Sequence, residues 1–168
     1  MSTSTVTALK SANARRGAEV LLEVLKSEGV EYLFGNPGTT ELSLMDALLR
    51  APALKYILAL QEASAVAMAD GYAQAARRPA FLNLHTYGGL GHGMGNLLNA
   101  SVSRTPLVVT AGQQDSRHTL TDPLLFGDLV KIAERCNQLG ANSRSDLEKQ
   151  LGEQSSIVAG LPPSAVLT

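Results

Sequence analysis

The chain has 168 residues, of which 45% are hydrophobic, so a single compact domain can bury an ordinary core without disulfides or structural metals. Its formal net charge of −1 leaves no basic excess to neutralise a phosphate backbone, which argues against nucleic acid as a partner. No apolar run approaches the roughly 20 residues that span a bilayer, and the first residues lack the apolar core of a secretory signal, so we expect a soluble, cytoplasmic protein without a membrane partner.

The first folded element that we expect is a helix that closes at a glycine. Residues 1–14 are rich in Ser and Thr, which predicts a disordered tail. From Ala18 onward apolar residues recur at helical spacing, and Gly29 is placed to end that helix. Residues 31–34 then predict a short strand, which the turn-forming residues 35–38 break.

Strand and helix continue to alternate as far as residue 110. Thr39 and Thr40 can cap a helix that runs through Leu49, with Glu41 in its first turn, where an acidic residue complements the helix dipole. The elements expected next are a strand over 56–60, a helix over 63–76, a strand over 80–84, a glycine-rich turn, a helix near 94–101 and a strand over 107–110. This alternation predicts an α/β fold, in which a parallel sheet carries helices on both faces in three layers.

The pattern ends where the composition changes. Residues 137–156 are polar and poor in large apolar side chains, and a short helix over 146–151 is the one element that we expect there. The simplest interpretation of residues 136–168 is a polar linker or a tail outside the domain.

Three loops follow the expected strands and carry the candidate chemistry, because ligands of open α/β sheets bind at the carboxyl ends of the strands. They are residues 35–40, 61–65 and 85–96. Glu62 stands between an apolar strand and a helix of small residues, a setting where burial favours the neutral form of a carboxyl. The first turn of a helix also favours an acidic residue for structural reasons alone, and both interpretations stay open.

The third loop is rich in glycine and histidine. Five glycines at positions 88, 89, 91, 93 and 95 indicate that another group approaches this backbone closely, although their spacing fits neither the dinucleotide fingerprint nor a P-loop. His85 is a candidate acid or base, and His92 and His118 are weaker ones, while a hydrogen-bonded structural role is the simpler interpretation of each from the sequence alone. The three histidines lack a compact ligand spacing, so we expect no metal site.

Five stretches, in this order, resemble the N-terminal domain of thiamine-diphosphate enzymes. They are residues 34–42, 57–63, 69–73, 79–85 and 106–114. The members that the chain most resembles are the benzoylformate decarboxylases and then the acetolactate-synthase-like enzymes. The resemblance implies a three-layer domain over residues 15–135 that binds the pyrimidine side of thiamine diphosphate, with a small 2-oxo acid as substrate.

The resemblance also implies roles for individual residues. Glu62 matches the glutamate that hydrogen-bonds the pyrimidine ring nitrogen and so activates the cofactor, and His85 matches a histidine that transfers protons to intermediates. Thr39 stands where benzoylformate decarboxylases carry a serine near the substrate. The residues implied to lie beside the cofactor are Asn36, Pro37, Gly38, Glu62, Gly88 and Gly91.

Enzymes of this family hold the diphosphate through Mg²⁺ on a second domain, at a Gly-Asp-Gly motif that these 168 residues do not contain. We therefore expect Mg²⁺ only through a diphosphate-binding domain outside this sequence. Three hypotheses stay open: a subunit that forms a homo-oligomer or pairs with a separate diphosphate-binding subunit, an inactive truncated fragment, and a non-enzymatic α/β association module. Under the first two, the chain alone should be nearly inactive.

Overall fold

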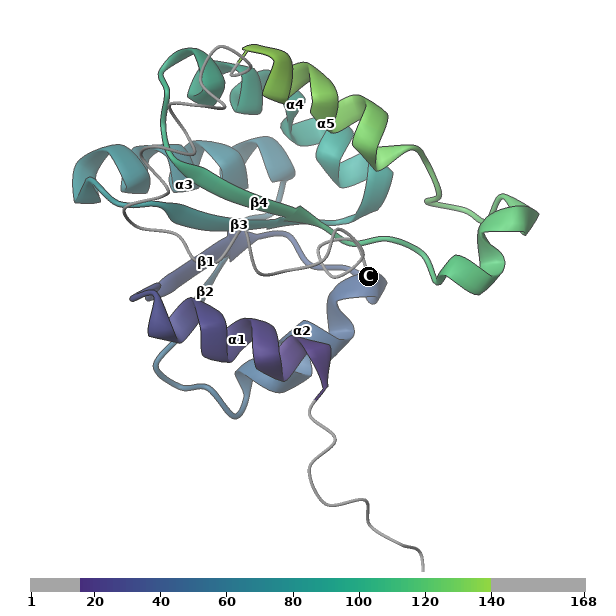
Figure 1. Ribbon diagram of the computed structural model, residues 1–168, viewed down its shortest axis with the longest axis horizontal. Helices are drawn as coiled ribbons and strands as arrows, with labels where there is room; N and C mark the ends of the chain where they lie inside the picture. The colour runs from purple at the N-terminus through teal and green to yellow at the C-terminus, as the bar shows by residue number, and fades with distance from the viewer. Residues whose placement is uncertain (1–15, 140–168) are drawn as a thin grey trace, which may run out of the picture.

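The computed structural model describes residues 16–139, in which a four-stranded parallel sheet lies between two layers of helices (Figure 1). In chain order the elements, with 3₁₀ helices marked η, are α1 (Gly17–Ser27), β1 (Tyr32–Gly35), η1 (Thr39–Glu41), α2 (Leu42–Leu48), β2 (Lys55–Leu58), α3 (Glu62–Ala76), β3 (Ala80–Leu84), α4 (Thr86–Val102), β4 (Leu107–Ala111), η2 (Ser116–Thr121) and α5 (Leu129–Leu139). The strand order is β2-β1-β3-β4, and each adjacent pair is parallel. The predicted α/β class with a helix-covered parallel sheet is confirmed.

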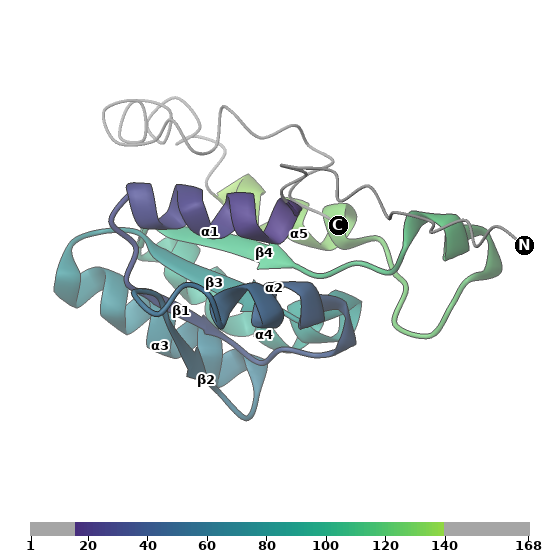
Figure 2. The same cartoon turned by 90° about the horizontal axis from the view of Figure 1, so that it is seen from below.

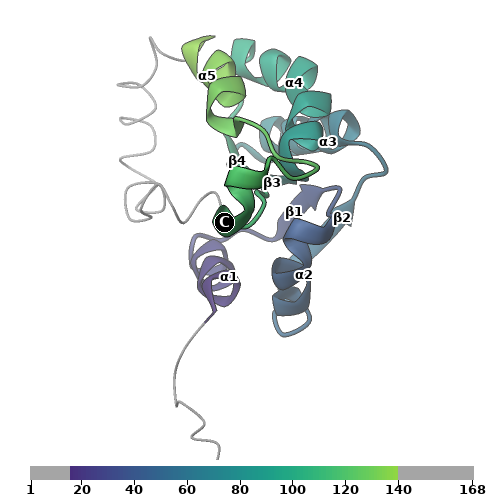
Figure 3. The ribbon, with the colours of Figure 1, turned by 90° about the vertical axis from the view of Figure 1, so that its right-hand side faces the viewer.

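The two faces of the sheet carry separate cores because successive strand residues point to opposite sides. On β3, Phe81 packs with the layer of α1 and α2, whereas Leu82 and Leu84 pack with the layer of α3, α4 and α5. Figure 3 shows these two helical layers on opposite sides of the strands. All five residues of β3 are buried, as expected for an inner strand that is covered on both faces.

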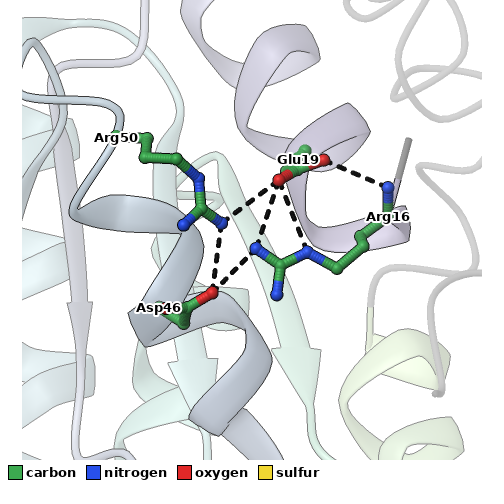
Figure 4. A network of polar contacts seen from close by, with 4 residues as sticks. All are labelled: Arg16, Glu19, Asp46 and Arg50. Atoms are coloured by element: carbon green, nitrogen blue, oxygen red, sulfur yellow. Dashed lines mark hydrogen bonds and ion pairs between the residues drawn. The ribbon is translucent and has the colours of Figure 1, made fainter. Parts of the chain in front are cut away.

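An ion-pair network joins α1 to α2 on the surface. Arg16 Nη2 lies 2.7 Å from Asp46 Oδ2, and Arg50 Nη2 lies 3.1 Å from both Asp46 Oδ2 and Glu19 Oε1 (Figure 4). These side chains are between 32% and 51% exposed, so water and salt screen their attraction. The network therefore orients the two helices, while most of the stability of this layer comes from apolar residues such as Leu25, which is 1% exposed.

The first helix ends as predicted. Glu28 caps α1, and Gly29 follows with a φ of +74°. Glycine adopts this left-handed conformation without the steric cost that a Cβ imposes, which explains why the helix closes at this position.

The glycine-rich turn was wrongly predicted, because this segment is helical. Helix α4 begins at Thr86, so all five glycines lie inside it and its start is well before the predicted one near Met94. Glycine in a helix costs about 1 kcal/mol relative to alanine, which made a turn the better sequence-based prediction. Tertiary contact overrides this cost, since a Cβ on Gly93 would lie 3.1 Å from Val66 Cγ2 and 3.4 Å from Leu84 Cδ1.

Three further boundaries differ from the sequence-based predictions. The helix predicted from Thr39 is divided into η1, for which Gly38 is the N-cap, and α2. The strand predicted over 56–60 is β2, Lys55–Leu58. Helix α5 was not predicted, and it runs through Cys136, so the boundary expected at residue 136 falls within a helix. The predicted tail over 1–14 and the predicted helix over 146–151 lie outside the described residues.

The connection between β4 and α5 lies apart from the two helical layers. It contains η2 and extends past the end of β4, away from the sheet, in both Figure 1 and Figure 2. Leu120 in η2 is 99% exposed, which agrees with this position.

Candidate functional site

The three candidate loops meet at one edge of the sheet because the strands before them are parallel. The loop after β1 begins at Asn36, Glu62 opens α3 shortly after β2, and His85 follows β3 directly as the N-cap of α4. The loop after β1 contacts both of the others, through Asn36 to Glu62 and through Thr40 and Glu41 to His85. The structure thus brings together residues that are far apart in the sequence.

Glu62 is a buried carboxyl, 6% exposed, with two polar contacts from different elements. Its Oε1 accepts a hydrogen bond from Asn36 Nδ2 at 3.2 Å, and its Oε2 lies 3.4 Å from His92 Nδ1. Both distances exceed the usual 2.9–3.0 Å, and a carboxyl offers about four lone-pair positions. Glu62 is therefore held loosely and can take a further hydrogen-bond partner.

Local sequence explains why Glu62 sits in this place. Gln61 caps α3 by accepting from the Ser64 backbone N–H at 3.2 Å, and an acidic residue in the next position complements the helix dipole. Gly89 of α4 lies against the Glu62 side chain, and a Cβ there would come within 3.1 Å of Glu62 Oε1. Asn96 Nδ2 donates to Ala63 O at 2.7 Å and fixes α4 beside this end of α3.

A second buried carboxyl, Glu41, lies at the same edge and was missed as a site residue. Its side chain is 2% exposed and has three partners. Its Oε2 accepts from the Gly38 backbone N–H at 2.8 Å and lies 2.8 Å from His85 Nδ1, while its Oε1 accepts from the Thr40 hydroxyl at 2.6 Å. We call Gly38, Thr40, Glu41 and His85 the Glu41 cluster.

Two glycines, Gly38 within the Glu41 cluster and Gly112 beside it, leave space for its side chains. A Cβ on Gly38 would overlap the His85 ring, and a Cβ on Gly112 would overlap the Glu41 carboxylate and the Thr40 hydroxyl. Gly38 has a φ of −122°, which any residue adopts, so its requirement is for space.

Tyr56 of β2 lies near the cluster, and among the described residues its buried hydroxyl has no hydrogen-bond partner. Burial raises the pKa of Tyr56, and the nearby Glu41 carboxylate raises it further. A neutral phenol is therefore the form that this site holds.

Thr39, Gly88 and Gly91, which the family resemblance implies at the site, are all exposed. Thr39 is exposed, and its neighbour Thr40 is the residue whose hydroxyl lies 3.2 Å from His85 Nδ1. Gly88 and Gly91 are on the exposed side of α4, with open space where a Cβ would stand. The close approach that the glycine pattern predicted occurs at Gly89 and Gly93.

The remaining candidates are Pro37, His92 and His118. Pro37 is half-buried in the loop after β1, and His92 contacts Glu62 although its side chain is 68% exposed. His118 is exposed in η2. Of the three histidines, the structure therefore brings two to the sheet edge.

Within residues 16–139, no group of three or more His, Cys, Asp or Glu side chains is arranged to hold a metal ion. Over the same residues, none of the helices has the length and hydropathy that a membrane crossing requires.

Residues 15–135 match the family model of the thiamine pyrophosphate enzymes, N-terminal TPP binding domain. Benzoylformate decarboxylase of Pseudomonas aeruginosa is 50% identical over 92 residues, which are 55% of this chain and 17% of that protein. The acetolactate synthase large subunit of Haemophilus influenzae is 32% identical over 117 residues, 70% of this chain and 20% of that protein. The thiamine diphosphate-dependent 4-hydroxybenzoylformate decarboxylase of Rhodococcus jostii superposes with a TM-score of 0.65 at 35% identity, covering 69% of this chain and 22% of that one. The chain thus spans about a fifth of the length of these relatives, and the resemblance drawn from its motifs is confirmed.

Proposed function

Because the chain belongs to the thiamine pyrophosphate enzymes, through their N-terminal TPP binding domain, we propose that it supplies the pyrimidine-binding half of a 2-oxo-acid decarboxylase or carboligase site. The observation that carries this proposal is the Glu62 carboxyl, which is buried at the carboxyl edge of a parallel sheet. Its relatives include proteins named benzoylformate decarboxylase and acetolactate synthase, which supports a small 2-oxo acid as the substrate.

The surroundings of Glu62 fit the pyrimidine end of the cofactor. A ring nitrogen there needs a carboxyl within hydrogen-bond reach, and Glu62 supplies one at the carboxyl edge of the sheet. The two polar contacts of Glu62 are long, at 3.2 and 3.4 Å, and neither comes from a lysine or arginine that would hold it permanently as an ion pair. The absence of a side chain on Gly89 leaves room for the carboxyl to adjust.

When bound, thiamine diphosphate supplies the electron sink that loss of carbon dioxide from a 2-oxo acid requires. Glu62 would hold or release a proton at a carboxyl oxygen, and Asn36 would keep that carboxyl oriented. His85 would exchange a proton with the substrate, and Thr39 would offer a hydroxyl to it. The residues proposed to lie along the cofactor are Asn36, Pro37, Gly38, Gly88 and Gly91.

We also propose that the diphosphate end and its Mg²⁺ are held by residues outside this sequence. The proposal is supported by the 168 residues, which contain no Gly-Asp-Gly motif, and by residues 16–139, which contain no cluster of metal ligands. The partner that completes the site would be a second copy of the chain or a separate diphosphate-binding subunit.

Calorimetric titration of thiamine diphosphate, with and without Mg²⁺, tests the proposal on three chains: wild type, Glu62→Gln and Glu134→Gln. We expect weak binding to the wild type that does not depend on the metal. Loss of a hydrogen bond to a carboxyl costs about 1.5–3 kcal/mol, so Glu62→Gln should bind about 10- to 100-fold more weakly. Glu134→Gln makes the same chemical change on an exposed carboxyl of α5 and should bind like the wild type.

Each other outcome contradicts a defined part of the proposal. Equal binding by Glu62→Gln would remove Glu62 from the site. Tight binding that requires Mg²⁺ would show a diphosphate site within the chain. No binding at millimolar cofactor would contradict a pyrimidine site that works in the isolated chain and would leave a half-site that requires its partner chain.

A further inference from the structure

We propose that Glu41 is a positioning residue: together with Thr40 it holds His85 in the tautomer with the proton on Nδ1, so that Nε2 is the atom at which His85 gains or loses a proton. That His85 transfers protons at all belongs to the proposed function. The tautomer itself follows from the contacts of the Glu41 cluster and can be measured without a cofactor.

The positions of the donors in the cluster determine the tautomer. Glu41 Oε2 lies 2.8 Å from His85 Nδ1, and a carboxylate only accepts hydrogen bonds. Thr40 Oγ1 lies 3.2 Å from the same nitrogen, but its single proton is already donated to Glu41 Oε1 at 2.6 Å. Thr40 can therefore only accept from His85. Both neighbours of Nδ1 are acceptors, so the proton of the neutral imidazole belongs on Nδ1.

The carboxylate that accepts these bonds is itself fixed. The Gly38 backbone N–H donates to Glu41 Oε2 at 2.8 Å, so Glu41 has a backbone donor, a hydroxyl donor and a ring donor. The Glu41 side chain is 2% exposed, whereas that of His85 is 21% exposed. The buried partner therefore holds one nitrogen of the ring, and the other nitrogen remains for proton exchange.

Gly38 and Gly112 border the spaces that the His85 ring and the Glu41 carboxylate occupy. The His85 ring lies against Gly38, where a Cβ would overlap it, and Gly112 leaves the space that the Glu41 carboxylate occupies. Glu41 and His85 are 44 residues apart in the sequence, and they meet because β1 and β3 are paired in the sheet. The pairing of β1 with β3 thus brings Glu41 to His85 and so determines which ring nitrogen of His85 carries the proton.

Nitrogen-15 spectra of histidine-labelled chain, recorded near pH 8, test this assignment directly. His85 is identified by the signal that is lost in His85→Gln, and exposed His118 serves as the internal reference. In the wild type we expect a proton-bearing Nδ1 and a bare Nε2. In Glu41→Gln the side-chain amide can donate to Nδ1, so the population of the Nε2-protonated tautomer should rise at least several-fold, while Glu41→Asp should retain more of the wild-type tautomer.

A wild-type His85 with its proton on Nε2 would overturn the proposal, as would an unchanged tautomer in folded Glu41→Gln. Circular dichroism establishes whether the variants fold, and the wild-type spectrum alone decides the assignment if they do not. The expected tautomer together with equal cofactor binding by Glu62→Gln would leave the assignment standing and the proposed function wrong, so the two failures are distinguishable.

Discussion

The hydroxyls of two tyrosines, Tyr72 and Tyr56, differ in their hydrogen bonding. Tyr72 Oη accepts from Arg78 Nη2 at 2.6 Å and from Arg78 Nε at 2.9 Å. Tyr56 Oη is buried with no partner among the described residues. An unpaired buried hydroxyl raises the free energy of the folded state, so the two tyrosines should respond oppositely to loss of that group.

We expect Tyr56→Phe to raise the free energy of unfolding by about 1 kcal/mol, because it removes a buried hydroxyl that makes no hydrogen bond. Tyr72→Phe is the matched control and should lower it, since it leaves Arg78 without its phenol acceptor. Urea denaturation at neutral pH measures both. A clear loss of stability in Tyr56→Phe would show that its hydroxyl has a partner in solution.

Tyr56→Phe should also change how the stability of the protein depends on pH above about pH 10. Burial raises the pKa of Tyr56 in the folded state, whereas an unfolded tyrosine ionises near pH 10. Above about pH 10 the folded state therefore binds more protons than the unfolded state, and stability falls as the pH rises further. Tyr56→Phe should lose this part of the alkaline decline, and superimposable pH profiles of the two chains would contradict the assignment.

At this scale the sequence could predict some site residues and not others. Glu62 and His85 became candidates because each follows an apolar strand, at the ligand-binding edge of a parallel sheet, and their proposed roles came from the family resemblance. Glu41 was interpreted only as a helix-dipole residue, because its contact with His85 depends on the pairing of β1 with β3. Local patterns carry no information about which strands are neighbours.

Helix α4 shows how tertiary contact overrides local propensity at the scale of an element. Its five glycines predicted a turn, yet the helix runs without a break from Thr86 to Val102. Gly89 and Gly93 lie against Glu62 and Val66, whereas Gly88, Gly91 and Gly95 have open space at the Cβ position. Gly89 and Gly93 therefore lie on the face of α4 that packs on α3. At Gly88, Gly91 and Gly95 packing does not require glycine.

Two alanine substitutions in α4 separate these roles. Gly95→Ala should raise the free energy of unfolding by about 0.5–1 kcal/mol, because alanine loses less conformational freedom in a helix and nothing lies near its Cβ. Gly89→Ala should gain less or lose stability, since its Cβ would lie 3.1 Å from Glu62 Oε1. Chemical denaturation of both variants measures the difference, and an equal gain at the two positions would mean that the Glu62 side chain moves aside at no cost.

For the whole molecule, the alternation of apolar strands and helices was sufficient to predict the class of fold, and the two helical layers confirm it. Helix α5 was missed because no element was expected between residue 110 and the change of composition at residue 136, and that change falls inside the helix. The strand order could not be predicted from the sequence either, because β1 lies between β2 and β3 and local patterns do not show which strands pair.

We expect the chain to associate with itself in a concentration-dependent way. Leu60, after the edge strand β2, is 91% exposed, Leu49 at the end of α2 is 81% exposed, and Leu42 is 63% exposed. Large exposed apolar side chains are typical of association surfaces, and within residues 16–139 no strand pairs with the outer side of β2. Sedimentation velocity over a range of concentrations should show a rising average mass, which Leu60→Lys should reduce. A single monomeric species at all concentrations would contradict this expectation.

The position of β1 between β2 and β3 also has a consequence for synthesis on the ribosome. β1 leaves the ribosome long before Phe81 and Asn83, which pair with Leu33 and Gly35 of β1. Such non-local pairing is slow because a long segment must close before any contact forms. The turn after β1 cannot make its contact with His85 until β3 has emerged and docked. The sheet edge that carries Glu62 and His85 is therefore completed only after β3 has emerged, and until then β1 can pair with β2 on one side but lacks its partner on the other.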